Sequence, residues 1–65
     1  MELKKLKNIR DIKHVNQEAI AELLGISKST YSRKENGKIV FKLEEVKLLK
    51  EYLNLSEKEI FEIFL

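Results

Sequence analysis

The stretch of sequence that decides the fold is residues 17–37, QEAIAELLGISKSTYSRKENG. Its first part, residues 17–24, carries apolar residues at the three- and four-residue spacing of one helix face. Gly25 is suited to end this helix, because glycine takes the left-handed conformation after a helix at little cost. A second short helix is predicted over residues 28–36 and stops at Gly37. So few residues separate the two helices that they must cross at a steep angle.

The starts of both helices carry the same two signals. Asn16 and Ser27 are residue types that cap the first turn of a helix well. Each cap lies between two apolar residues at the spacing of a hydrophobic staple, which fixes how the chain enters the helix. The two staple pairs are Val15 with Ile20 and Ile26 with Tyr31.

The second helix of this stretch has an unusual surface. Tyr31 is predicted to be its inward residue, so that its neighbours at 27, 28, 29, 32 and 33 face solvent. These neighbours are Ser, Lys, Ser, Ser and Arg, whereas a helix that is only solvated favours stronger helix formers than serine. Short side chains let a helix approach another surface closely, and the cations indicate that this surface is anionic.

The distribution of charge agrees with an anionic partner. The net charge is only +2, but residues 27–42 carry five cations and one anion, whereas residues 43–65 carry three cations and six anions. A basic middle and an acidic end are typical of a protein that binds a polyanion through one face. Uneven charge also arises by chance in lysine-rich helical proteins, so charge alone leaves the question open.

Length and composition limit the number of domains, the kinds of site and the location of the protein. A chain of 65 residues predicts a single domain over residues 1–65, too small to enclose a pocket for a large substrate. The absence of cysteine excludes disulfides and thiolate zinc sites. The sequence contains no signal peptide and no apolar segment long enough to span a membrane, so we expect a cytoplasmic protein.

Three further helices and no strand are predicted outside residues 17–37. The first covers residues 2–13, and the last begins at a capping box, in which Ser56 and Glu59 satisfy each other's backbone N–H groups. The apolar positions that mark these helices are Leu3, Leu6, Ile9 and Ile12, then Leu43, Val46, Leu49 and Leu53, and finally Ile60, Phe61, Ile63 and Phe64.

Residues 17–37 closely resemble the helix-turn-helix of the lambdoid phage repressor and Cro family, also called the Xre family. The resemblance extends over nearly the whole chain and implies an all-α fold, a compact five-helix bundle of the lambda-repressor-like type. The second and third helices of the bundle would form the helix-turn-helix. The matching positions are Arg10, Gln17, Ala21, Gly25, Ile26, Ser27, Tyr31, Glu35 and Gly37.

The resemblance assigns roles to the polar residues of this region. In the family the third helix enters the major groove of duplex DNA with its N-terminal residues against base edges. The base-reading residues would be Lys28, Ser29, Ser32 and Arg33, with Ser27 at the edge, although Lys28 and Arg33 could contact phosphates instead. The phosphate contacts would come from Asn16, Gln17, Asn36, Lys38, Arg10 and Lys42.

Two of these residues have a further role in the family. The glutamine at position 17 also braces the first base-reading side chain, here Lys28. Arg10 has an alternative to phosphate binding, because in many relatives this arginine forms a structural ion pair with the residue at position 35, here Glu35. Such a pair fixes the geometry of the loop after the third helix more than it stabilises the fold.

The sequence departs from the family pattern at three places. Lys34 occupies a site that is usually apolar, so we expect its aliphatic stem to cover apolar surface while the ammonium group reaches water. Lys42 is a poor helix cap before the fourth helix. The apolar run of residues 39–41 either closes the core or forms a dimer contact. Residues 60–65 also carry more apolar side chains than one buried face needs, so those that do not face the core are a second candidate surface for self-association.

These observations predict a sequence-specific, double-stranded DNA-binding transcriptional regulator. We expect a phage or mobile-element repressor that binds operator DNA as a weak homodimer, without cofactor, metal, membrane or small-molecule substrate. An enzyme is not expected, since His14 is the only histidine and is interpreted as a surface residue of the turn before residue 16. The alternative is an interaction module, such as an antitoxin that binds a partner protein with or without autoregulatory DNA binding.

Overall fold

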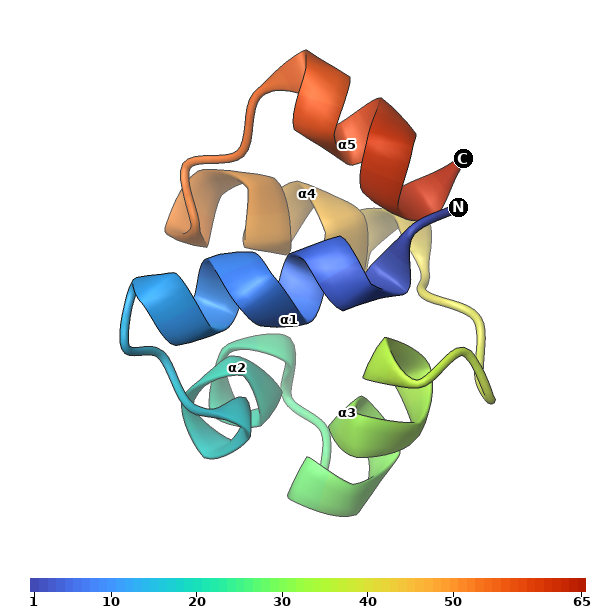
Figure 1. Ribbon diagram of the computed structural model, residues 1–65. Helices are drawn as coiled ribbons and strands as arrows, with labels where there is room; N and C mark the ends of the chain where they lie inside the picture. Colours follow the sequence, from blue (N-terminus) through green and yellow to red (C-terminus); the bar gives the residue numbers. More distant parts are fainter.

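All five predicted helices are present in the computed structural model, which describes residues 1–65, and no strand is found. Figure 1 shows them as an all-α bundle whose two chain ends lie together. The first helix is one residue shorter than predicted at each end, and the third ends one residue earlier than predicted. The helices are α1 (Leu3–Ile12), α2 (Gln17–Leu24), α3 (Lys28–Glu35), α4 (Leu43–Tyr52) and α5 (Glu57–Phe64).

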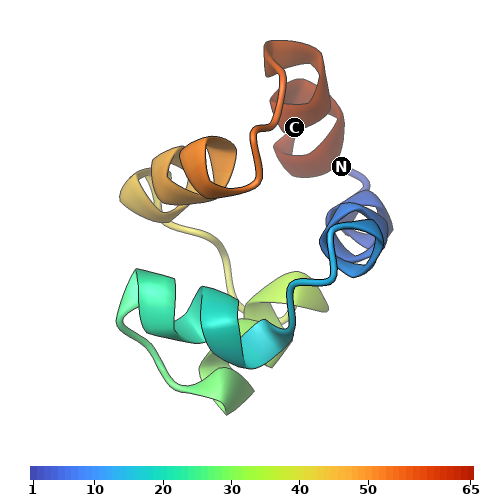
Figure 2. The same cartoon turned by 90° about the vertical axis from the view of Figure 1, so that its left-hand side faces the viewer.

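Helices α2 and α3 form one end of the molecule and α5 forms the other, with α1 and α4 between them. Figure 2, turned by 90°, shows α1 nearly end-on on one side of this middle layer and α4 on the other. The backbone N–H of Glu2 donates hydrogen bonds to the carbonyl groups of Glu62 and Ile63, at 2.9 and 3.2 Å, which ties the start of the chain to α5. All five helices reach one core, which consists of Leu6, Ile20, Ala21, Tyr31, Leu49, Leu53, Leu55 and Ile63.

The turn between α2 and α3 is formed as the sequence predicts. The side chain of Asn16 accepts a hydrogen bond from the backbone N–H of Ala19 at 2.8 Å, and that of Ser27 accepts one from Thr30 at 3.1 Å. Gly25 takes the left-handed conformation with φ of 71°, and no other residue type adopts it as readily. This turn sets the steep crossing of α2 over α3.

Two of the apolar residues that mark the predicted helices are exposed. Leu43, expected on the inward face of its helix, is 69% exposed, so that expectation was wrong, and Ile12 is 74% exposed. In α1 the buried residues are Leu6 and Arg10, and in α4 they are Glu45 and Leu49. The buried face of each helix therefore includes a charged residue, and Ile12 and Leu43 lie on other sides of their helices.

The prediction for Lys34 was also wrong. Its side chain is buried, and its ammonium group does not reach water but lies 2.6 Å from Oε1 of Glu45 on α4. The pair forms because Glu45, at the third position of α4, turns back toward the helix start and accepts the Lys42 backbone N–H at 2.8 Å. A buried carboxylate next to the end of α3 requires a cation, and Lys34 supplies it.

The apolar run of residues 39–41 divides between core and surface. Phe41 packs edge-on against Tyr31 and against Phe64, with ring centroids 6.1 and 5.2 Å apart, and so closes the core between α3 and α5. Val40 is 85% exposed, and Ile39 is partly exposed. The run therefore serves the core through Phe41 and leaves an apolar surface beside it.

No helix of the protein has both the length and the apolar character to cross a membrane.

Candidate nucleic-acid interface

The residues predicted to read bases lie on the outer side of α3. Tyr31 is completely buried on the inner side of this helix, which directs the opposite side toward solvent. Ser32 is half-buried, and none of the five side chains is packed beneath another part of the chain. The exposed members of the set are Ser27, Lys28, Ser29 and Arg33.

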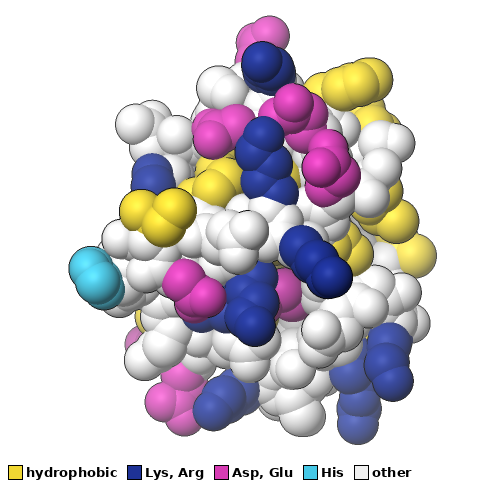
Figure 3. Space-filling view, viewed as in Figure 1, with side chains coloured by type: hydrophobic (Ala, Val, Ile, Leu, Met, Phe, Trp, Pro, Cys, Tyr) yellow, Lys and Arg dark blue, Asp and Glu magenta, His cyan; other side chains and the backbone are white.

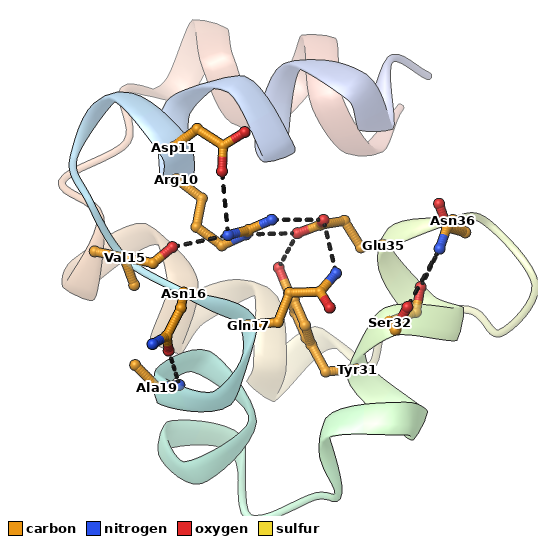
Figure 4. A network of polar contacts seen from close by, with 10 residues as sticks. All are labelled: Arg10, Asp11, Val15, Asn16, Gln17, Ala19, Tyr31, Ser32, Glu35 and Asn36. Carbon is orange, nitrogen blue, oxygen red and sulfur yellow. Dashed lines mark hydrogen bonds and ion pairs between the residues drawn. The ribbon is translucent and has the colours of Figure 1, made fainter.

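A buried polar network holds Tyr31, and with it α3, in place (Figure 4). The Tyr31 hydroxyl donates to Oε2 of Glu35 at 2.8 Å. Arg10 on α1 donates to both oxygens of the same carboxylate, from Nε at 2.9 Å and from Nη2 at 3.1 Å. A bidentate pair of this kind fixes orientation as well as distance. The network therefore fixes the direction of α3 relative to α1.

Burial and hydrogen bonding shift the pKa of Glu35 in opposite directions. Burial alone would raise its pKa, but hydrogen bonds from Arg10, Tyr31 and Gln17 lower it, and the net pKa is below the ordinary value. Burial, followed by the hydrogen bond to this carboxylate, raises the pKa of the Tyr31 hydroxyl. Glu35 is therefore ionised and Tyr31 protonated at neutral pH, as the observed hydrogen bonds require.

Of the two roles considered for Arg10, the structure shows the ion pair. Its side chain is buried, and Nη1 donates to the Val15 carbonyl at 2.8 Å and lies 3.3 Å from Asp11. Because Nε and Nη2 donate to Glu35, all three nitrogens of the Arg10 guanidinium group have partners inside the protein. The proposed phosphate contacts therefore do not include Arg10.

Gln17 is attached to this network and not to the base-reading residues. Its Nε2 donates to Oε1 of Glu35 at 3.1 Å, and no hydrogen bond joins it to Lys28. The bracing of Lys28 by Gln17 is thus not present in the free protein. The half-buried side chain lies in the first turn of α2, where free backbone N–H groups favour an anion.

Of the other predicted phosphate contacts, Asn16 precedes α2, and Asn36, Lys38 and Lys42 lie in the loop between α3 and α4. Asn36 donates from Nδ2 to the Ser32 carbonyl at 2.8 Å, and Asn16, Asn36, Lys38 and Lys42 are all exposed. Figure 3 shows Lys and Arg side chains over α3 and this loop, whereas over α5 several Asp and Glu side chains surround Lys side chains. Helix α3 and the loop after it therefore carry an excess of cations, and α5 carries an excess of anions.

Sequence reasoning missed one pair of residues that shapes this surface, Lys34 and Glu45. The available signals were a lysine at a site that the related family fills with an apolar residue, and a glutamate at the third position of α4.

The single histidine, His14, is exposed in the turn after α1, where it has a positive φ of 58°. No group of three His, Cys, Asp or Glu side chains could hold a metal ion.

Comparison with known families agrees with this geometry. A family model described as helix-turn-helix matches residues 6–60, from α1 to the start of α5. The chain belongs to this family, the Cro/C1-type helix-turn-helix proteins, and its fold is the all-α, lambda-repressor-like one. It is a DNA-binding transcriptional regulator. Searches of the curated proteins and of the solved structures gave no significant match.

Proposed function

We propose that this protein is a regulator of phage or mobile-element Cro/repressor type, which binds operator DNA in the cytoplasm and has no enzymatic activity. The observation that carries the proposal is the exposed face of α3, where Ser, Lys and Arg side chains lie opposite the buried Tyr31. A helix with short polar side chains and flanking cations fits the major groove, which admits one α-helix.

In this proposal the residues on α3 read bases. Lys28 and Arg33 donate to guanine, the commonest specific contact, while Ser29 and Ser32 serve several bases and Ser27 lies at the edge. Ser27 also caps α3, since its Oγ accepts the Thr30 N–H, so its hydroxyl is partly committed to the fold. A serine-rich reading face implies modest direct discrimination, supplemented by the shape of the DNA.

The phosphate contacts surround the reading face. Asn16 and Gln17 lie at the start of α2, and Asn36, Lys38 and Lys42 lie in the loop that follows α3. Such contacts fix the register of the protein on the duplex but carry no sequence information. Their number sets how steeply binding weakens as salt is added.

We also propose that two copies bind together, through an apolar groove of about 430 Å³. The two dimer surfaces considered from the sequence, residues 39–41 and the end of α5, line this same groove. Figure 3 shows hydrophobic side chains along the edge of the molecule near the chain ends. The most exposed groove residues are Met1, Val40, Leu43 and Leu65.

Binding selection from random duplex DNA at two salt concentrations tests this function. We expect an enriched site with two related half-sites about one helical turn apart, and affinity that falls steeply with salt. Selection without enrichment, or no binding to any duplex at low ionic strength, would overturn the proposal. The second candidate is an antitoxin-like module whose partner protein occupies the apolar groove. This second candidate would be favoured if the protein bound a partner protein regardless of salt, and if a charged residue in place of Val40 abolished that binding.

A further inference from the structure

A hollow of about 490 Å³ lies between the first two turns of α1 and the end of α3. It is separate from the apolar groove in character, because most of the side chains around it are charged or polar. None of the base-reading residues lines it. The residues that line it are Met1, Glu2, Leu3, Lys4, Lys7, Glu35 and Asn36.

The hollow adjoins the surface already assigned to DNA. Asn36, a proposed phosphate contact, forms part of its wall, and Glu35 in that wall accepts a hydrogen bond from Gln17, another proposed phosphate contact. A Cβ at Gly37 would lie only 3.4 Å from the Leu3 side chain, so the start of α1 packs directly on the loop after α3. A DNA strand that follows this loop therefore passes next to α1, which lies above the network in Figure 4.

The lysines of α1 and its final turn fall into two groups. Lys5 forms an ion pair with Glu62, and Lys13 donates to the Leu53 carbonyl, so both are used inside the protein. Lys4 and Lys7 are exposed, form no ion pair, and both line the hollow. Of these four lysines, the two without a protein partner are thus the two that line the hollow.

The local charge of the hollow is favourable for an anion. The carboxylate of Glu35 is matched by the bidentate pair with Arg10, which leaves Glu2 as the one unpaired acidic side chain against two lysines. The side-chain amide of Asn36 donates from Nδ2 to the Ser32 carbonyl, so the free hydrogen-bond donors of the hollow are the two ammonium groups. Two unpaired ammonium groups are suited to phosphate oxygens.

We propose that Lys4 and Lys7 bind backbone phosphates of the same duplex, on the strand that passes Asn36, and so extend the DNA contact from the helix-turn-helix onto α1. The inference rests on the proposed function, because it requires that α3 enter the groove. It adds two contacts that the resemblance of the sequence to the family did not assign. Both contacts strengthen binding to every sequence alike, since phosphates carry no base information.

The test compares two double variants that remove the same charge. Lys4→Ala/Lys7→Ala removes the cations of the hollow, while Lys47→Ala/Lys58→Ala removes exposed lysines of α4 and α5. Each phosphate contact contributes about 0.9 to the slope of log affinity against log salt, so the first variant should lower the slope by about 1.8. Between 50 and 200 mM salt, wild type should therefore lose about tenfold more affinity than this variant. The control variant should keep the wild-type slope.

A second measurement locates the contact on the DNA. Duplexes that carry the selected site are made with one uncharged methylphosphonate linkage at each backbone position in turn. Wild type should lose affinity at positions flanking the half-site at which Lys4→Ala/Lys7→Ala loses none. If both double variants change the slope equally, or if every position affects both proteins alike, the inference is wrong. Because these experiments begin with wild type bound to its site, that failure is distinct from failure of the proposed function.

Discussion

Nζ of Lys34 lies 2.6 Å from Oε1 of Glu45, and both side chains are buried. The same ammonium group lies 3.4 Å from the Val40 carbonyl, and the same carboxylate oxygen accepts the Lys42 backbone N–H. One ion pair thus joins the end of α3, the loop that follows it and the start of α4. Burial would raise the pKa of Glu45, but hydrogen bonds from Lys34 and Lys42 hold it below the ordinary value.

We expect Lys34→Ala to destabilise the protein by about 2–3 kcal/mol, because Glu45 is left as an unpaired buried charge. Lys34→Met keeps most of the volume and, in the double variant with Glu45→Gln, should leave the stability near that of wild type. Urea unfolding measures both effects. Lys38→Ala, at an exposed position, is the control and should change the free energy of unfolding by less than about 0.5 kcal/mol. Equal effects at positions 34 and 38 would contradict the role of the pair.

The two buried carboxylates also predict how stability depends on pH. The pKa values of Glu35 and Glu45 in the folded protein lie below the ordinary 4.5, so the unfolded chain takes up protons first as pH falls. Their contribution is fully present above about pH 4.5 and is lost as pH drops through the folded-state pKa values. The free energy of unfolding should therefore decrease on acidification.

Urea unfolding between pH 7 and pH 3 measures this dependence. Glu35→Gln and Glu45→Gln each remove one titrating group, so each variant should show a shallower loss of stability with falling pH than wild type, whatever its stability at neutral pH. Glu44→Gln, at an exposed position of the same helix as Glu45, is the matched control. A slope in either variant as steep as that of wild type would show that the group is not linked to folding.

The sequence predicted the helices well because their ends depend on local chemistry. Asn16, Ser27 and Ser56 each cap a helix as expected, and Gly25 has the backbone conformation that the turn requires. Tyr31 could be placed inside by its spacing from Ile26, and the exposed face of α3 followed from it. Local spacing is sufficient for these features because each involves residues close together in the chain.

The Arg10–Glu35 ion pair was expected only through the family resemblance, and the burial of Lys34 and Glu45 was not predicted, because burial depends on contacts distant in the chain. The Lys34–Glu45 pair joins two helices across a loop, and only the folded positions of both bring them together. Leu43 was expected on the inward face because apolar residues recur at regular spacing in its helix, and Ile12 marked the first helix by the same spacing. In their helices charged residues, Arg10 and Glu45, take up part of the buried face because each has a partner there. Apolar periodicity contains no information about such pairs.

On α3 and the loop after it, two lysines should differ in what they recognise. Lys28→Ala removes a proposed contact to a base edge, so it should relax preference at one position of the site by about 1–3 kcal/mol. Lys38→Ala removes a proposed phosphate contact and should weaken all sequences alike. Selection from random duplex DNA, followed by affinities for wild-type and single-base variants of the site, measures both. Equal losses that ignore sequence in both variants would refute the assignment of Lys28.

The apolar groove gives the last prediction, which separates dimer formation from folding. Val40 is 85% exposed, so Val40→Glu should leave the unfolding free energy nearly unchanged while it places a charge in the proposed dimer contact. We expect the variant to bind a single half-site like wild type but to lose cooperative binding to two half-sites, about tenfold in affinity, the equivalent of 1.4 kcal/mol. Lys50→Glu, on the exposed surface of α4 and outside the groove, is the control. Band-shift titrations on duplexes with one and two half-sites measure the difference. If Val40→Glu binds both duplexes like wild type, the groove does not join two copies on DNA.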